Sequence, residues 1–131
     1  MALLAVAVAL LAVGIADACE PPRGFTARAR LESAGLVVMF RTLPPAIEIG
    51  RHFNIEALVC ADGPAPVLTR VDADMPEHRH GMNYRPSLKE TGAGRYVAEG
   101  LLFHMAGRWR LLFDLEQAGR RTQLVTDVLL E

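Results

Sequence analysis

Most of the chain consists of short runs in which apolar and polar residues alternate, with turn-forming residues between the runs. In residues 25–32, for example, every second side chain is Phe, Ala or Leu, and the others are Thr, Arg or Glu. A period of two places successive side chains on opposite faces of a β-strand, whereas an amphipathic helix has a period of about 3.6 residues. Because no long run with the helical period competes with this pattern, the sequence predicts an all-β protein.

The alternating runs follow one another at short intervals, at residues 25–32, 36–41, 52–60, 67–75, 85–90, 95–103, 109–116 and 122–130. The segments between them are rich in Gly and Pro, which are typical of turns. Seven to eight short strands at this spacing are typical of an antiparallel, immunoglobulin-like β-sandwich. A chain of 131 residues is long enough for one such domain and too short for two. In the run at 109–116, we expect Trp109 and Phe113 to face the core, and Arg110 and Asp114 to face water.

The first 18 residues do not share the alternating pattern. Residues 2–15 are all Ala, Val, Leu, Ile or Gly, and they lead into Ala16-Asp17-Ala18, a small-x-small sequence that signal peptidase accepts. The apolar run is shorter than the roughly 20 residues that a membrane-spanning helix needs. We therefore expect residues 1–18 to be a signal peptide and residues 19–131 to be an exported, periplasmic domain. A buried hydrophobic helix is the alternative interpretation of the first segment.

The chain has two cysteines, Cys19 and Cys60. In an exported protein they are expected to form one disulfide, with two free thiols as the alternative. Cleavage after Ala18 would also make Cys19 the first residue of the mature protein, and a lipid anchor on Cys19 is the alternative interpretation of this position. The Leu expected three residues before a lipidated cysteine is Ala16 here, so the motif for lipidation is incomplete.

Charge and motifs exclude several classes of function. The formal net charge is −1 and the isoelectric point is near 6.4, so we expect no nucleic acid as a partner. Neither Ser33 nor Ser87 lies in a nucleophile elbow, and the sequence has no HExxH motif and no phosphate-binding glycine loop. We therefore expect a protein that is not an enzyme.

Residues 75–105 contain most of the histidines and methionines that remain after the predicted signal peptide. We consider six of them as candidate metal ligands: His78, His80, Met82, His104, Met105 and Met75. Because His78 and His80 are two positions apart, both imidazoles point the same way in an extended segment. Imidazole binds copper, zinc and nickel, and thioether sulfur favours Cu(I). The combination predicts a copper ion as the bound metal.

Each candidate also has a plainer interpretation. Met75 and Met105 stand at strand ends, where methionine commonly fills the core. His78 and His80 fit a solvated loop, and His104 fits a hydrogen-bonded structural residue. Strand alternation also places His104 and Met105 on opposite faces, so we expect only one of these two to be a ligand.

The other histidine and the acidic residues near this segment are weaker candidates for metal ligands. His52 has no methionine neighbours, and we expect it to be structural. Asp72, Asp74 and Glu77 would extend the site for a harder metal, but alternating acids on an outer strand face are usually only solvated.

The residues of this segment also carry a family resemblance. The pattern is Met75-Pro76-x-His78-x-His80-Gly81-Met82, then Gly94-x-Tyr96, then Gly100-x-x-Phe103-x-Met105-x-Gly107-x-Trp109-x-Leu111. Over roughly residues 52–130 it resembles the YtkA-like domains, which are exported immunoglobulin-like domains similar to the FixH accessory proteins of cytochrome oxidase gene clusters. The resemblance implies a small β-sandwich outside a bacterial membrane, with a role in handling copper or another transition metal. The chain departs from the pattern at Glu77-His78-Arg79-His80, where family members often have Met-Gly-His.

Two hypotheses follow from these observations. The first is a periplasmic protein that binds or delivers copper through the histidines and methionines of residues 75–105. The second is a non-catalytic, immunoglobulin-like interaction module, in which Pro76–Pro86 forms a recognition loop for a membrane protein or an oxidase assembly partner. A dependence of binding on chelators distinguishes the two.

Overall fold

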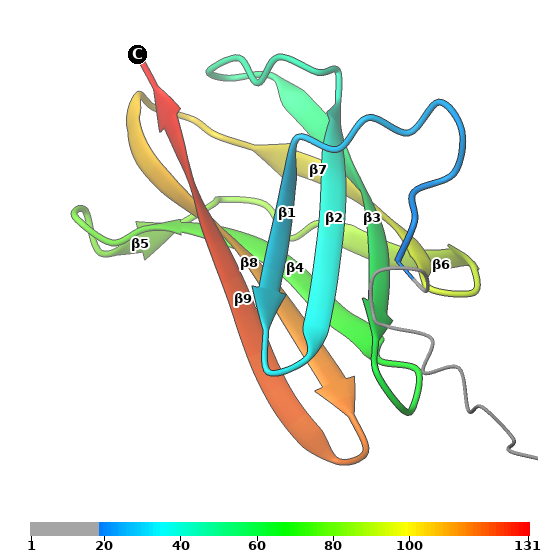
Figure 1. Cartoon of the computed structure of the whole chain (residues 1–131). Coiled ribbons are helices and arrows are strands. Elements are labelled where there is room, and N and C mark those ends of the chain that lie inside the picture. Colours follow the sequence, from blue (N-terminus) through cyan, green and yellow to red (C-terminus); the bar gives the residue numbers. More distant parts are fainter. Residues whose placement is uncertain (1–18) are drawn as a thin grey trace, which may run out of the picture.

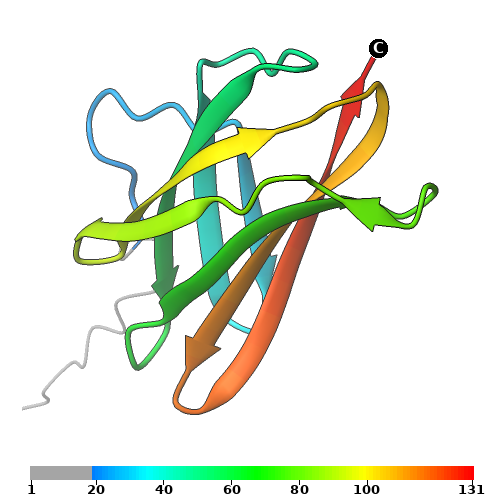
Figure 2. The same cartoon turned by 180° about the vertical axis from the view of Figure 1, so that it is seen from behind.

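The computed structural model describes residues 19–131, so the predicted signal peptide lies outside the described residues. These residues form two antiparallel β-sheets packed against each other, without a helix among them (Figures 1 and 2). The strands are β1 (Ala29–Ser33), β2 (Leu36–Leu43), β3 (His52–Ala61), β4 (Val67–Met75), β5 (His80–Gly81), β6 (Ser87–Gly92), β7 (Arg95–Leu102), β8 (Gly107–Gln117) and β9 (Arg120–Leu130). The predicted all-β sandwich is confirmed.

The order of the strands identifies the type of sandwich. One sheet has the order β1-β2-β3-β7-β6, and the other has the order β5-β4-β8-β9. Without β1, these orders correspond to the A-B-E-D and C′-C-F-G sheets of the immunoglobulin fold. The predicted immunoglobulin-like architecture is therefore confirmed, with β1 as an additional edge strand beside β2.

Inward-facing side chains of both sheets make up one core. Trp109, Leu111, Phe113 and Leu115 on β8 are completely buried, as the alternation of this strand predicts. Arg110 and Asp114, which lie between them, are partly exposed on the other face, because strand side chains alternate. The hydrophobic pattern thus determines which face of β8 lies against the opposite sheet.

The prediction for residues 25–32 is only partly correct, because a strand begins there only at Ala29. Residues 19–28, which we call the covering segment, lie over the outer face of β2. There Val37 and Met39 are buried against Phe25 and Cys19. A segment that packs on a sheet without pairing to it also has an apolar residue at every second position. Alternation alone therefore does not distinguish such a covering segment from a β-strand.

A disulfide between Cys19 and Cys60 fastens this covering segment to the end of β3, as the sequence predicts. The alternative of two free thiols is wrong. A sulfur atom in a disulfide cannot also carry a thioether-linked lipid, so the bonded form of Cys19 excludes a lipid anchor at that atom. Disulfides persist in oxidising compartments, which supports export of the protein. Residues 19–131 contain no helix that is long and apolar enough to cross a membrane.

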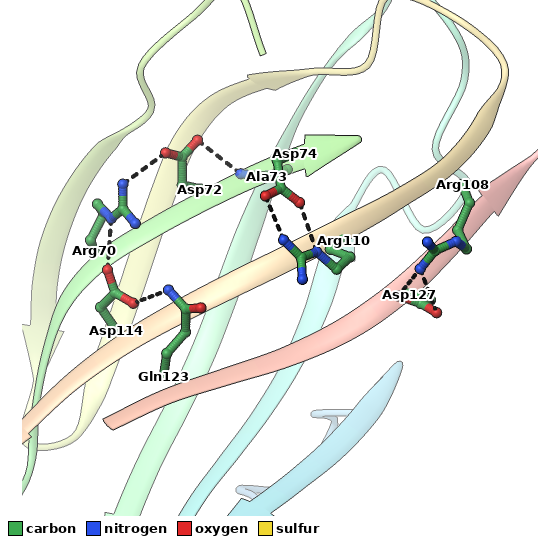
Figure 3. A network of polar contacts seen from close by, with 9 residues as sticks. All are labelled: Arg70, Asp72, Ala73, Asp74, Arg108, Arg110, Asp114, Gln123 and Asp127. Carbon is green, nitrogen blue, oxygen red and sulfur yellow. Dashed lines mark hydrogen bonds and ion pairs between the residues drawn. The ribbon is translucent and has the colours of Figure 1, made fainter. Parts of the chain in front are cut away.

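The outer face of the four-stranded sheet carries a network of ion pairs (Figure 3). Arg110 donates two hydrogen bonds to the carboxylate of Asp74, at 2.9 and 2.7 Å, and Arg70 bonds both Asp72 and Asp114. The hydrogen bond to Asp114 is the main reason why the pKa of Arg70 is raised, and the hydrogen bonds to Asp74 are the main reason why the pKa of Arg110 is raised. Because Asp72 and Asp74 are occupied by arginines, the structure does not support a carboxylate extension of the metal site at these positions.

Candidate metal centre

The candidate site lies at one end of the sandwich, where β4 reverses direction into the short strand β5. Residues 76–79 form the turn, the backbone N–H of His78 donates to the carbonyl of Met75 at 3.1 Å, and His80 pairs with Met75. Arg79 has a φ of +56°, a left-handed conformation that costs a non-glycine residue about 1 to 2 kcal/mol. This turn brings the imidazoles of His78 and His80 to a centroid distance of 5.7 Å.

A third imidazole joins them from the loop between β7 and β8. The ring centroid of His104 lies 5.1 Å from that of His80, and the two ring planes are inclined by 33°. The pairing of β4 with β8 brings this loop to the end of β4, although His104 is far from His80 in the sequence. The structure thus collects the three predicted histidines into a row with His80 in the middle, which we call the histidine row: His78, His80 and His104.

The spacing within the histidine row suits a shared metal ion. Two imidazoles bound to one ion through bonds of about 2 Å have ring centroids about 5 to 6 Å apart. Among residues 19–131, however, no group of three or more His, Cys, Asp or Glu side chains forms a ready-made metal site. Binding one ion in the histidine row therefore requires the imidazoles to rotate about their side-chain torsions.

The Nδ1 atom of His104 is buried and has no hydrogen-bond partner. Leaving a buried polar atom unpaired costs about 1 to 3 kcal/mol. This nitrogen therefore does not fit the alternative of a hydrogen-bonded structural histidine. A metal ion at the nitrogen would supply the missing partner, so the donor chemistry of the row fits a metal that binds imidazole.

Trp109 forms the floor beneath the histidine row. Its ring stacks on Phe103 with centroids 4.5 Å apart, and it makes edge contacts with His104 at 5.4 Å and His80 at 6.0 Å. Its Nε1–H donates to the carbonyl of Met105 at 3.0 Å, which fixes the loop that carries His104. The buried aromatic core thus positions one end of the candidate site.

The three methionines occupy different environments. Met75 is only 1% exposed, and its Cε would lie 2.7 Å from a Cβ atom placed at Gly107. This position fits the core interpretation, and we omit Met75 from the proposed ligand set. Met82 and Met105 are half-buried at the margin of the core. Both therefore remain candidate thioether ligands at this end of the sandwich.

Glu77, the acidic residue within the turn, also forms an ion pair with an arginine. Arg108 on β8 donates to the carboxylate of Glu77 at 3.1 Å and also bonds Asp127 at 3.4 Å. The hydrogen bond from Arg108 to Glu77 is the main reason why the pKa of Arg108 is raised. The pair connects the turn to β8 and engages one carboxylate oxygen of Glu77.

The fourth histidine lies at the same end of the sandwich. His52 begins β3 and pairs with Leu102, which lies two residues before His104 in the sequence. The ring of His52 makes an edge contact with the ring of Tyr84, with centroids 5.0 Å apart. Tyr84 is 47% exposed. The sequence does not indicate this placement, because it depends on the pairing of β3 with β7.

No family model matches the chain, and neither curated proteins nor solved structures give a match. The resemblance to YtkA-like domains stays a prediction. The interpretation of the site therefore depends on the geometry of the histidine row and on the chemistry of its donors.

Proposed function

We propose that this is a periplasmic metal-binding protein that carries one copper ion in the histidine row. The observation that supports this most strongly is the placement of three imidazoles with centroid spacings of 5.7 and 5.1 Å. His80 belongs to both close pairs, so it is the central ligand in this proposal. Met82 and Met105, which are partly buried at the margin of the core, complete the proposed ligand set as thioether donors.

The donors around the row favour copper over a hard cation. Calcium and magnesium prefer oxygen ligands, but Asp74 and Glu77 are bonded to Arg110 and Arg108. Imidazole binds copper, zinc and nickel, copper is the most tightly bound of the three, and thioether sulfur adds a preference for Cu(I). The oxidising compartment inferred from the disulfide is also one in which exported copper proteins work.

Titration of the metal-free protein with copper tests the proposal. Trp109 is the only tryptophan of the chain and lies 5.4 Å from the ring of His104. Bound Cu(II) is therefore expected to quench its fluorescence, with an end point at about one ion per chain and recovery on addition of a chelator. Zinc is expected to bind more weakly, following the order of divalent metal affinities.

The matched variant for this titration combines His78→Ala and His80→Ala. The proposal expects the double variant to lose the end point while its circular dichroism spectrum stays that of a β-sandwich. An unchanged copper stoichiometry in the folded double variant would show that copper does not bind in the histidine row.

A second candidate function is an interaction module for a membrane protein or an oxidase assembly partner. The exposed Tyr84 favours it, because exposed aromatic side chains on loops are common binding residues. In this case residues 76–86 form the recognition loop, and capture of the partner from a detergent extract does not depend on metal. Release of the partner by a chelator would contradict this candidate.

A further inference from the structure

The last strand, β9, forms one edge of the four-stranded sheet (Figure 1). It has 11 residues and pairs with β8 along its whole length without a register shift. The other edge strands of the described fold offer less to another chain: β1 has 5 residues, β5 has 2, and the register of β6 shifts before Gly92. Short strands and bulges protect sheet edges from pairing with other chains. The edge of β9 has neither device, and the strand contains no Pro or Gly.

The turn between β8 and β9 determines which backbone groups of β9 point away from β8. Ala118 and Gly119 have φ of +47° and +77°, as in a two-residue type I′ turn. The residues that flank such a turn, here Gln117 and Arg120, are hydrogen-bonded to each other. Because hydrogen bonding alternates along an antiparallel pair, every second residue from Arg121 onward points its N–H and C=O away from β8.

These outward backbone groups of β9 are available to another strand. Although β1 of the opposite sheet lies close to β9, the two strands belong to different sheets. Within residues 19–131, no backbone hydrogen bond joins β9 to any segment other than β8. The edge therefore presents a straight row of donors and acceptors over the full length of the strand.

Two opposite charges are placed symmetrically about the middle of β9. Arg121 precedes Leu124 by as many residues as Asp127 follows it. The side chain of Arg121 contacts Glu116 but is 87% exposed, and that of Asp127 contacts Arg108 at 3.4 Å but is 59% exposed. If two β9 strands pair in antiparallel orientation about Leu124, each Arg121 stands opposite Asp127 of the other copy. Opposite charges in such cross-strand positions attract each other.

The same register suits the other side chains of the strand. Thr122 stands opposite Thr126 of the second copy, and Thr–Thr pairs are favourable across antiparallel strands. Val125 is 45% exposed on the outer face of β9, and it stands opposite Gln123 of the second copy. Pairing thus covers an apolar side chain that is open to water in the single chain.

From these observations we infer that β9 pairs with β9 of a second copy of this chain, which joins two four-stranded sheets into one sheet across a two-fold axis. The inference does not depend on the proposed function. The end of β9 at Leu130 pairs with Gly107, which lies at the end of the sandwich that carries the histidine row. Antiparallel pairing therefore places the two histidine rows at opposite ends of the joined sheet, away from the contact.

Analytical ultracentrifugation of the metal-free protein, from about 1 μM to 1 mM, measures the dissociation constant of the dimer. Val125→Pro removes an N–H that points away from β8, and proline is tolerated at such edge positions. The dissociation constant is expected to rise about tenfold or more, because one hydrogen bond is lost from each copy. Val125→Thr is the matched control, since it keeps the N–H and a β-branched side chain, and its dissociation constant is expected to change by less than about threefold.

The charges are tested by Arg121→Asp and Asp127→Arg, separately and together. Each single variant places like charges opposite each other and is expected to raise the dissociation constant about fivefold or more. The combined variant restores opposite charges, so its dissociation constant is expected to return to within about threefold of the original value. Circular dichroism verifies that each variant is folded, and the charge variants decide the outcome if Val125→Pro does not fold.

A metal-free protein that stays monomeric up to about 1 mM would overturn the inference and leave the edge to an extended segment of another protein. An unchanged dissociation constant in folded Val125→Pro, or a combined charge variant no better than the single ones, would also overturn it. Association that occurs only after addition of copper would assign the contact to the metal and not to β9.

Discussion

His80→Ala is expected to weaken copper binding by about 100-fold or more while the protein remains folded. His80 is the only member of the histidine row that is close to both others, at 5.7 Å from His78 and 5.1 Å from His104. Loss of a residue that merely orients a metal ligand costs about 10- to 100-fold in affinity, so loss of the central ligand is expected to cost at least as much as the upper figure. Competition with a chelator of known copper affinity measures the change.

His52→Ala is the matched control for this variant. His52 lies at the same end of the sandwich, but its ring contact is with Tyr84 and not with the row. Its replacement is therefore expected to leave the copper affinity within about threefold, a change of less than about 0.7 kcal/mol in binding free energy. Equal losses in the two variants would show that binding follows the number of histidines in the chain and not their arrangement.

Removal of the disulfide, in the double variant Cys19→Ala with Cys60→Ala, is expected to lower the free energy of unfolding by about 3 to 4 kcal/mol. The two cysteines are separated by 41 residues, and closing a loop of that length restricts the unfolded chain by about this amount. The covering segment also loses its anchor, so that Val37 and Met39 become exposed on the outer face of β2. Chemical denaturation of both proteins measures the difference.

Phe25→Ala separates the two parts of this effect. It keeps the disulfide but removes the contact of the Phe25 ring with Arg41, whose guanidinium carbon lies 4.9 Å from the ring centre. We expect a smaller loss of about 1 kcal/mol, which is typical of such a contact at a partly exposed position. If Phe25→Ala costs as much as removal of the disulfide, the stability comes from packing of the segment and not from the cross-link.

Copper binding is expected to survive loss of the disulfide. Cys60 lies near one end of β3, whereas the candidate site lies at the other end of that strand, beyond His52. Alanine variants are preferable to reduction for this comparison, because free thiolates bind copper themselves.

The sequence predicts the fold well where one physical constraint dominates. The buried side chains of β8 follow from the alternation around Trp109, because a strand packed on one face admits a single register. The same alternation misplaces the start of β1, because residues 25–28 bury Phe25 and Ala27 against the outer face of the sheet without forming a ladder.

The candidate site is predictable only in part. The sequence places His78 and His80 two positions apart in one extended segment, whereas the structure has His78 in the turn and His80 at the start of β5. The approach of His104 depends on the pairing of β4 with β8, which no local pattern contains. Asp74 illustrates the same limit, since only the register of these strands reveals that Arg110 occupies its carboxylate.

X-ray absorption spectroscopy of the copper-loaded protein measures the ligands of the ion directly. Coordination by the histidine row predicts two or three nitrogen ligands at about 2 Å, with the outer-shell scattering of imidazole, and one imidazole fewer in His78→Ala. Bound copper without imidazole scattering, or a spectrum that His78→Ala leaves unchanged, would contradict coordination by the row.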